Sequence, residues 1–381
     1  MRKKSAAFTL YVPIIAMTVL ILDSETAFSG TLEGLELCLR TVIASLFPFF
    51  VLSVLLTSAL IAHPIRWLTP LGNLCGIPSG AEGIFLLGLI GGYPVGAQAI
   101  KQAWEAGALS ENDAKRMLGF CNNCGPSFLF GITATVFSDS CISWILWGIH
   151  LLSAVLTGVL LPKHTCHPIE SNISESQMDL PKALWKGAKN LATVCCWIIL
   201  ARCITAYLKK WMINRAPETL QIIVYGFLEL TNGCIASIQI ESEWIRFLAV
   251  SAFLAAGGVC VALQTVSVTG NLGTGWYFPG KLLQLSNSLF LGATVSPFLY
   301  PESRFHPIFL CLPVISAGII CYIRKKEVAF SGKLMYNHCQ ITDAKEPKPC
   351  FSAVKSPNPA PTVPTEPKSL KDRSSASKKV S

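Results

Sequence analysis

Charged side chains are scarce in this chain of 381 residues: 14% of the residues are Asp, Glu, Lys or Arg, whereas 51% are hydrophobic. An ordinary soluble protein carries about a quarter charged residues. The scarcity therefore excludes a cytosolic enzyme and a DNA-binding protein. Long apolar runs take the place of the missing charges, and several approach the roughly 20 residues that a membrane-spanning helix needs. The sequence predicts a polytopic membrane protein.

Acidic residues are fewer than basic ones, with 22 Asp and Glu against 31 Lys and Arg, and the net charge is +9. Residues 324–381 hold 12 of the basic and 5 of the acidic residues, so most of the excess lies at the C-terminus. This segment is rich in Pro, Ser and Lys and poor in apolar residues, which is typical of disorder. We expect a cytoplasmic tail, residues 326–381, held near anionic lipid, and no nucleic-acid partner.

The sequence also lacks a framework of spaced cysteines, because its 15 cysteines are scattered, many of them in apolar runs. This excludes a secreted disulfide scaffold. Three motifs suggest metal or nucleotide binding only weakly: the pair Cys121 and Cys124, the loop His164–His167, and Gly275–Leu282. The last resembles a P-loop but has leucine in place of the Ser or Thr that holds Mg²⁺. We expect no enzymatic activity, no resident metal and no cofactor.

The N-terminal segment, residues 1–30, has three basic residues, Arg2 to Lys4, ahead of the apolar stretch Phe8–Leu22. A signal peptide has the same outline. An uncleaved transmembrane anchor is the preferred interpretation, since the rest of the chain is itself apolar enough to lie in a membrane. The basic residues predict a cytoplasmic N-terminus in the bacterial cell membrane.

Two of the later apolar runs are interrupted. Gly91-Gly92-Tyr93-Pro94 breaks the run 84–100, and Glu229 with Asn232-Gly233 breaks the run 220–240. Non-helical backbone within a membrane is tolerated only where it is buried in protein or lines a water-filled cavity. We therefore predict an all-α fold with about eight transmembrane helices and two re-entrant hairpin or half-helix elements.

An internal repeat is suggested by Gly91–Gln98 and Gly257–Gln264, which share the pattern G-G-x-x-V-small-x-Q. Shorter matches in the same order pair Ser127–Gly131 with Ser288–Gly292, and Gly76 and Gly83 with Gly226 and Gly233. We predict a two-fold repeat formed by residues 31–165 and 188–325 and joined by a polar linker at 166–187, with an inverted arrangement of the two halves left open. Interrupted segments at matching places are a sequence signal for a transporter site.

Polar residues gather at these interruptions. Asn122 and Asn123 need hydrogen-bond partners in an apolar span, so they either join neighbouring helices or face a cavity and bind a polar solute. Glu229 is a functional candidate because carboxylates are rare in membrane segments, although it could also lie in an interfacial loop. The candidate substrate-binding residues are Gly91, Gly92, Tyr93, Pro94, Gly96, Gln98, Asn122, Asn123, Gly125, Pro126, Ser127, Glu229, Thr231, Asn232, Gln264 and Asn287.

Three functions fit these features. The first is a secondary transporter of a small polar solute, which works without ATP by alternating access around a site near the membrane midplane. The second is a non-transporting membrane scaffold that recruits partners through its basic tail. The third is divalent-metal permeation through Glu229 with Cys121 and Cys124. Expected partners are membrane lipid and an unidentified solute, with a homo-oligomer left open.

The same motifs resemble a known family. The segments Phe47–Ser53, Pro78–Gln98, Phe120–Gly131 and Glu229–Gly233 are similar to the YlbJ family of sporulation integral membrane proteins, within the wider nucleoside-recognition (Gate) domain proteins. The resemblance covers roughly residues 30–325 and is less close at Cys124 and in the second half. It implies a role in making the spore cortex, re-entrant hairpins around a permeation site, and a cavity formed by residues 91–98, 122–127 and 229–233.

Overall fold

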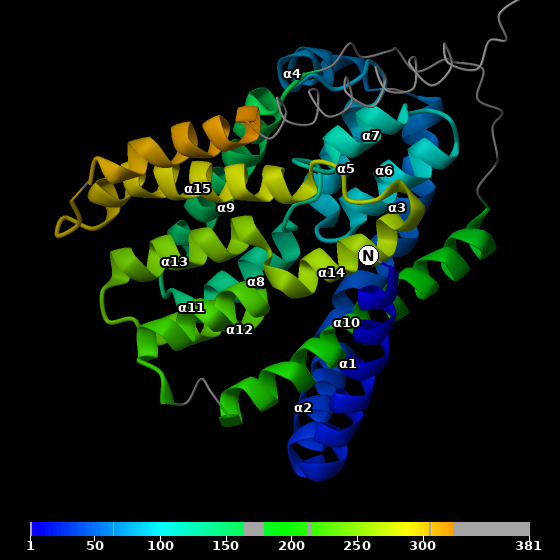
Figure 1. The fold of residues 1–381 in the computed structure, drawn as a ribbon. Helices are drawn as coiled ribbons and strands as arrows, with labels where there is room; N and C mark the ends of the chain where they lie inside the picture. The colour runs from blue at the N-terminus through cyan, green and yellow to red at the C-terminus, as the bar shows by residue number, and fades with distance from the viewer. Residues whose placement is uncertain (1, 64, 164–178, 212–214, 305, 323–381) are drawn as a thin grey trace, which may run out of the picture. The chain divides into compact units, whose positions relative to one another are not determined.

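The computed structural model describes residues 2–63, 65–163, 179–211, 215–304 and 306–322. Within these ranges the regular elements are helices and no strand occurs, so the predicted all-α class is confirmed for this part of the chain (Figure 1). The predicted tail and the His164–His167 motif lie outside the described residues. The labelled helices are α1 (Arg2–Leu22), α2 (Ser24–Leu37), α3 (Ile43–Ala62), α4 (Thr69–Cys75), α5 (Glu82–Gly91), α6 (Val95–Glu105), α7 (Glu111–Met117), α8 (Pro126–Val136), α9 (Ser140–Leu160), α10 (Leu180–Trp211), α11 (Glu218–Leu228), α12 (Leu230–Ala236), α13 (Glu243–Ala256), α14 (Gly258–Thr269) and α15 (Tyr277–Leu299).

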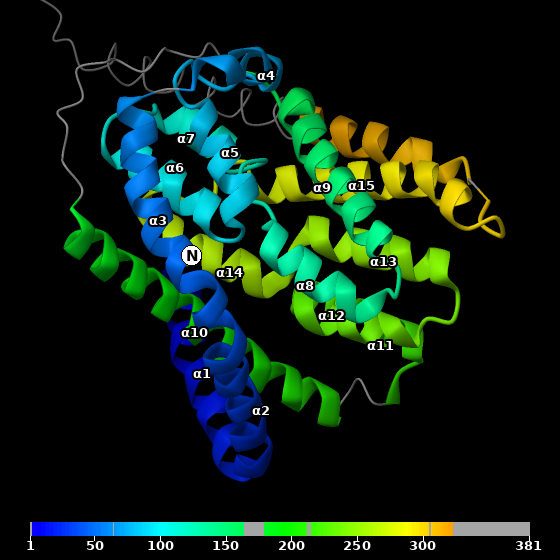
Figure 2. The ribbon, with the colours of Figure 1, turned by 180° about the vertical axis from the view of Figure 1, so that it is seen from behind.

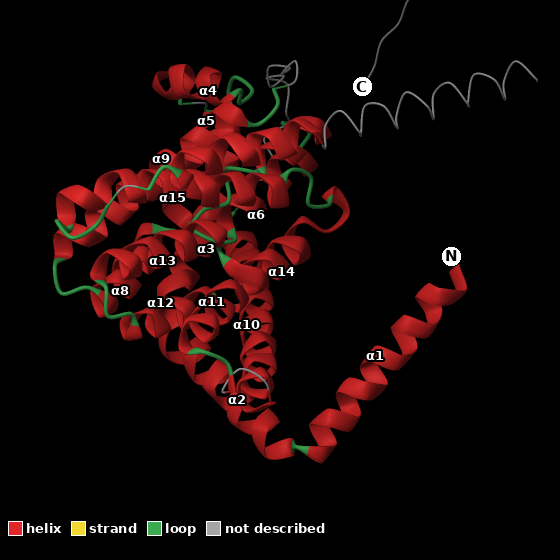
Figure 3. Ribbon diagram, turned by 60° about the vertical axis from the view of Figure 1, so that its left-hand side comes forward, coloured by secondary structure: helices red, strands yellow, loops and turns green. Residues whose placement is uncertain are grey.

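Four helical segments are long and apolar enough to cross a membrane: Ser140–Leu160, Leu180–Trp211, Glu243–Leu272 and Tyr277–Leu299. The number rises to six if each of two bent helix pairs is one span. One bent pair is α1 with α2, which meet at 98°, and α1 points away from the other helices (Figure 3). The described residues thus contain four to six candidate spans, and the predicted count of about eight stays a prediction.

Two helical hairpins occupy the interrupted runs. Helices α5 and α6 pack against each other and are joined by Gly92, Tyr93 and Pro94, and Gly92 has the positive φ of 76° that favours glycine. Helices α11 and α12 also pack against each other, and the single extended residue Glu229 joins them. The four helices have 7 to 11 residues each, too few to cross a bilayer alone. Hairpins therefore occur at both interruptions.

A third break lies between α7 and α8, inside the apolar run 117–137. Helix α7 begins after Ser110, whose hydroxyl caps it by accepting a hydrogen bond from the Asp113 N–H at 3.1 Å. The chain then runs without helix through residues 121–125. Helix α8 starts at Pro126. Proline suits this position because the N–H of the first helical residue has no partner within the helix.

The predicted repeat partner of the first hairpin has a different geometry. Gly257 and Gly258 separate α13 from α14 with φ values of 74° and 77°, yet both helices belong to one candidate span, Glu243–Leu272. At the matching Gly91 and Gly92 the chain instead turns back on itself. The same glycine pair thus gives a break in one place and a hairpin in the other, and the two-fold repeat stays a prediction.

The buried apolar side chains form two main clusters. One gathers around α3, α5, α6 and α7, and the other around α8, α9, α11, α12 and α13, with α15 contributing to both. Figure 2 shows these two groups of helices on different sides of the ribbon. Two of the predicted segment boundaries fall within helices. Helix α10 begins at Leu180, inside the predicted linker 166–187, and the predicted boundary at residue 30 lies within α2.

Candidate functional site

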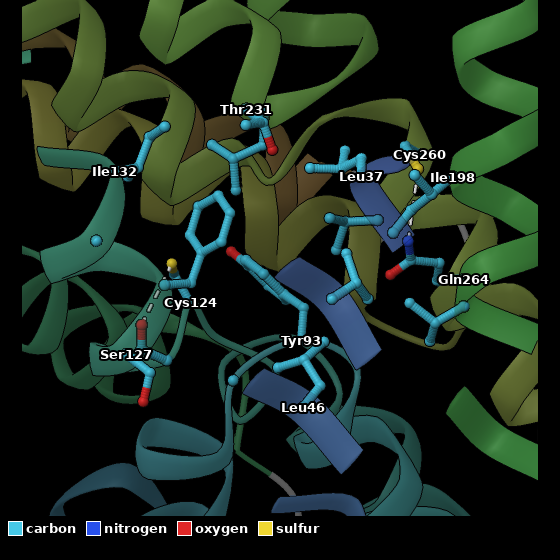
Figure 4. Close-up of a pocket in the computed structure, with 18 of the residues that line it drawn as sticks. Leu37, Leu46, Tyr93, Cys124, Ser127, Ile132, Ile198, Thr231, Cys260 and Gln264 are labelled. Atoms are coloured by element: carbon cyan, nitrogen blue, oxygen red, sulfur yellow. Dashed lines mark hydrogen bonds between the residues drawn. The ribbon is translucent and has the colours of Figure 1, made fainter. Parts of the chain in front are cut away.

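A cavity of about 450 Å³ lies between the two hairpin turns. Figure 4 shows Tyr93 near its centre, with Cys124 and Ser127 on one side and Gln264 on the other. The wall formed by α2, α3 and α10 is apolar, and the polar groups lie at the hairpin turns and on α8, α12 and α14. The predicted site residues that line the cavity are Gly91, Gly92, Tyr93, Gly125, Ser127, Glu229, Thr231 and Gln264.

The other predicted site residues do not line the cavity. Pro94 and Gly96 lie on either side of the first residue of α6, and Pro126 is the first residue of α8. Asn232 lies in α12 and donates its backbone N–H to the Glu229 carboxylate that caps this helix. Asn287 donates to the Thr157 hydroxyl at 3.2 Å, a contact between α15 and α9. The members of the predicted set that are absent from the cavity lining are Pro94, Gly96, Gln98, Asn122, Asn123, Pro126, Asn232 and Asn287.

Close backbone contacts fix the first hairpin against the segment that precedes α8. A Cβ atom added at Gly88 or Gly96 would lie 1.9 or 2.0 Å from the Cys121 carbonyl oxygen. A Cβ at Gly92 would lie 2.9 Å from the Gly125 backbone nitrogen. Glycine at these positions allows the two segments to touch, and side chains there would push them apart.

The two adjacent asparagines are fully buried and hydrogen-bonded. The Asn122 amide donates to the Thr265 hydroxyl of α14 at 2.9 Å, and its oxygen accepts from the Ala97 N–H at 3.4 Å. The Asn123 amide donates to the Phe120 carbonyl at 2.7 Å. These bonds join the first hairpin, the extended segment and α14, which is the role of interhelical contact that the sequence left open.

A buried lysine extends this network to the cavity. The Lys281 amine donates to the Gln284 side-chain oxygen at 2.8 Å and to the Tyr93 hydroxyl at 3.0 Å. The Gln284 amide donates in turn to the Asn123 oxygen at 2.8 Å, and the Tyr93 hydroxyl to the Leu254 carbonyl at 3.1 Å. Among the described residues no carboxylate lies within 4.0 Å of this amine.

An acidic residue, Glu229, lines the cavity at the turn of the second hairpin. The Glu229 carboxylate accepts hydrogen bonds from the backbone N–H groups of Thr231 at 3.0 Å and Asn232 at 2.9 Å, so it caps α12. One carboxylate oxygen lies 3.5 Å from an Arg202 guanidinium nitrogen on α10. Both side chains are largely buried, and the pair links α10 to the turn of the second hairpin.

Three functional candidates were not predicted from the sequence: Lys281, Arg202 and His150. Each is an ionisable residue in an apolar helix, a signal that marks functional positions in membrane proteins. Lys281 was assigned only to the P-loop-like motif, and the other two lie in runs interpreted as plain spans. His150 is buried and accepts the Cys124 N–H at 3.0 Å.

The site can surround a small solute with hydrogen-bonding groups, including the Glu229 carboxylate, on one side and an apolar surface on the other. Neither Cys121 nor Cys124 is in a disulfide, and both are buried. Within the described ranges, no group of three or more His, Cys, Asp or Glu residues is arranged to hold a metal ion. The polar side chains that line the described cavity are hydroxyls, the Gln264 amide and the Glu229 carboxylate, and the Lys281 amine reaches it through the Tyr93 hydroxyl.

Comparison with known proteins gives one relative, the sporulation integral membrane protein YlbJ of Bacillus subtilis (strain 168). The chain is 26% identical to it over 140 residues. The match covers 36% of this chain and 34% of the relative, so it spans about a third of the length of each. No protein-family model matches the chain, and no solved structure matches it. The chain is thus similar to a sporulation membrane protein over part of its length.

Proposed function

We propose that this protein is a secondary transporter of a small polar solute and that it acts in the cell membrane during sporulation. The observation that carries the proposal is the cavity of about 450 Å³ at the turns of two helical hairpins. Transporters bind solutes at interrupted helices near the membrane midplane. The similarity to YlbJ supports the link to sporulation, and the apolar helices support the membrane location.

In this proposal the cavity alternates between access from the two sides of the membrane. The turn of the first hairpin, with Tyr93, and the start of α8, with Ser127, supply hydrogen-bonding groups on one wall. Gln264 and Thr231 supply them on the opposite walls, and the apolar face of α2, α3 and α10 excludes water. The N-terminus is cytoplasmic, as its basic residues indicate, and the Gate-type arrangement suggested by the motifs is part of the same proposal.

Ligand-dependent stability of the purified chain tests the proposal. Thermal unfolding in detergent is measured against nucleosides, nucleobases, amino acids, small dicarboxylates and divalent metals. A ligand at 100 times its Kd stabilises the folded state by about 2.7 kcal/mol. We expect at least one class to raise the melting temperature and to be taken up by vesicles that contain the protein.

The cavity is tested by Gln264→Leu and Ser127→Val, because both residues line it and neither joins the asparagine network. We expect both variants to lose the ligand-induced shift. Asn271→Ala is the matched control, since it removes an exposed amide outside the cavity. A panel with no shift and no uptake, with the variants folded, would contradict the transporter proposal.

A further inference from the structure

We propose that Lys281 is the proton-binding site of this transporter, so that solute movement is coupled to protons. The inference rests on the proposed function and adds the identity of the coupling ion. Its basis is a buried amine with two neutral acceptors and no carboxylate within 4.0 Å among the described residues. A charge in such a place is costly unless it is paired.

The hydrogen bonds of Lys281 match those of a neutral amine. A neutral amine has two N–H groups, and Lys281 donates two hydrogen bonds, to Tyr93 and to Gln284. Protonation adds a third N–H, for which the described residues offer no further oxygen acceptor. The amine does lie 4.8 Å from the centre of the Tyr93 ring, whose face attracts a cation. The surroundings therefore hold the neutral form and can still receive the ammonium form.

The titratable groups that face Lys281 are each held in one protonation state by a hydrogen bond. The Tyr93 hydroxyl donates to the Leu254 carbonyl, and the Cys124 thiol donates to the Gly125 carbonyl at 3.7 Å. His150 accepts the Cys124 N–H at Nε2, so that nitrogen cannot take a proton unless the bond breaks.

The remaining titratable neighbours lie along or beside α15. Tyr277 lies one turn before Lys281 on the same helix and is fully buried. The charged groups of α13 are Glu243 and Arg246, which interact with Tyr300 at the opposite end of α15. Of these groups, Lys281 is the one whose lone pair is free to take a proton while its existing hydrogen bonds stay in place.

Tyr93 connects this proton site to the solute. Its ring lies in the cavity and its hydroxyl accepts from Lys281, so a solute that displaces the ring also changes the contacts of the amine. When the cavity opens to one side, the amine nitrogen accepts H⁺ from water, and it returns H⁺ when the cavity opens to the other side. One N–H bond forms and the same bond breaks in each cycle.

Nitrogen-15 NMR of the full chain in vesicles, labelled at lysine Nζ, tests the proposal directly. A neutral amine and an ammonium group give separate signals. At pH 8 we expect one neutral-amine signal that is missing in Lys281→Met and that converts to the ammonium position towards pH 5. The exposed Lys182 serves as the control, because Lys182→Met should leave the neutral signal unchanged.

The variant Gln284→Glu sharpens the test, because it puts a carboxylate where the amide oxygen now accepts from the amine at 2.8 Å. We expect this variant to fold and to keep Lys281 as ammonium throughout the pH range. A wild-type Lys281 that stays ammonium from pH 5 to pH 8 would overturn the proposal. Failure of uptake in the solute panel, with Lys281 still changing its signal, would count against transport and leave the proton site standing.

Discussion

The two hairpins at the cavity are held by different forces. The first, α5–α6, touches the segment before α8 through glycine backbone contacts and through the neutral hydrogen bond between the Ala97 N–H and the Asn122 oxygen. The second, α11–α12, has a charged residue, Glu229, at its turn, and this residue reaches α10 through one ion pair of 3.5 Å. Gly226 and Gly233 let the two helices of the second hairpin touch, and a Cβ atom added at Gly226 would lie 2.1 Å from the Phe253 ring of α13, a side chain rather than backbone.

This difference indicates which hairpin moves. At the first hairpin, backbone atoms touch so closely that a Cβ atom would not fit between them, and backbone cannot turn aside. Protein interiors are densely packed and deform little, so this hairpin has little room to slide past the segment before α8. The second hairpin packs through side chains against α8, α13 and α14, and its ion pair of 3.5 Å with α10 is longer than a hydrogen bond between charged groups. We therefore expect α11–α12 to be displaced when the cavity opens and α5–α6 to stay fixed.

The largest loss of stability is expected when a methyl group is added where Gly96 of the first hairpin touches the Cys121 carbonyl. Gly96→Ala puts a Cβ atom 2.0 Å from the Cys121 carbonyl oxygen, which is backbone and cannot turn aside. Overpacking usually costs about 1–3 kcal/mol, and we expect the upper end or more here. The measurement is the yield of monodisperse protein and its melting temperature in detergent.

A glycine without close neighbours provides the control for this contact. Gly148 lies in α9 with nothing within 4 Å of an added Cβ, so Gly148→Ala should be neutral or stabilising. If Gly96→Ala melts within a degree of the parent protein, the first hairpin is not held by this contact and the comparison between the hairpins fails.

The second largest effect is expected at the ion pair. Glu229→Ala removes the carboxylate that caps α12 and leaves the Arg202 guanidinium without its acidic partner. Breaking a buried pair costs about 3–5 kcal/mol, and because the Arg202 side chain is 15% exposed we expect the lower end. Thermal unfolding of the purified variant gives the shift.

Removing both charges should cost less than removing one. The double variant Glu229→Gln with Arg202→Met keeps an oxygen to cap α12 and leaves no unpaired charge in the interior. We expect it to melt above Glu229→Ala. Equal melting temperatures would mean that neither the cap nor the unpaired guanidinium accounts for the effect, and that the loss of the ion-pair attraction, which both variants share, does.

The two hairpins also show which features of the fold the sequence can predict. Composition and apolar runs predict a helical membrane protein, and Gly-Gly-x-Pro and Glu229 mark both turns, because these residues interrupt a helix by their own local chemistry. Contacts between residues far apart in the sequence could not be predicted in this way. Nothing in the local sequence indicates that Lys281 reaches Tyr93, 188 residues away, or that Gly257-Gly258 leaves a span intact where Gly91-Gly92 ends in a hairpin.

A smaller effect is expected for the neutral network of the first hairpin. Asn123→Ala leaves the Gln284 amide without its acceptor, and an unsatisfied buried donor costs about 1–3 kcal/mol. Asn271→Ala removes an exposed amide that bonds Lys101 and should cost less than about 0.5 kcal/mol. The two melting temperatures are compared directly, and equal values would show that the bond between Asn123 and Gln284 of α15 does not stabilise the fold.

The smallest effect on stability is expected at Gln98, and it separates folding from function within the first hairpin. This side chain is 5% exposed, and among the described residues neither of its amide atoms has a hydrogen-bond partner. Replacing an unsatisfied buried amide by an apolar group of similar size is nearly neutral or stabilising, so Gln98→Leu should melt at or above the parent temperature. A clear fall would mean that the amide has a partner, such as a bound water, and belongs to the structural network with Asn122. Unchanged melting with loss of solute uptake would instead show that the amide serves transport without stabilising the fold, although it lies outside the cavity lining.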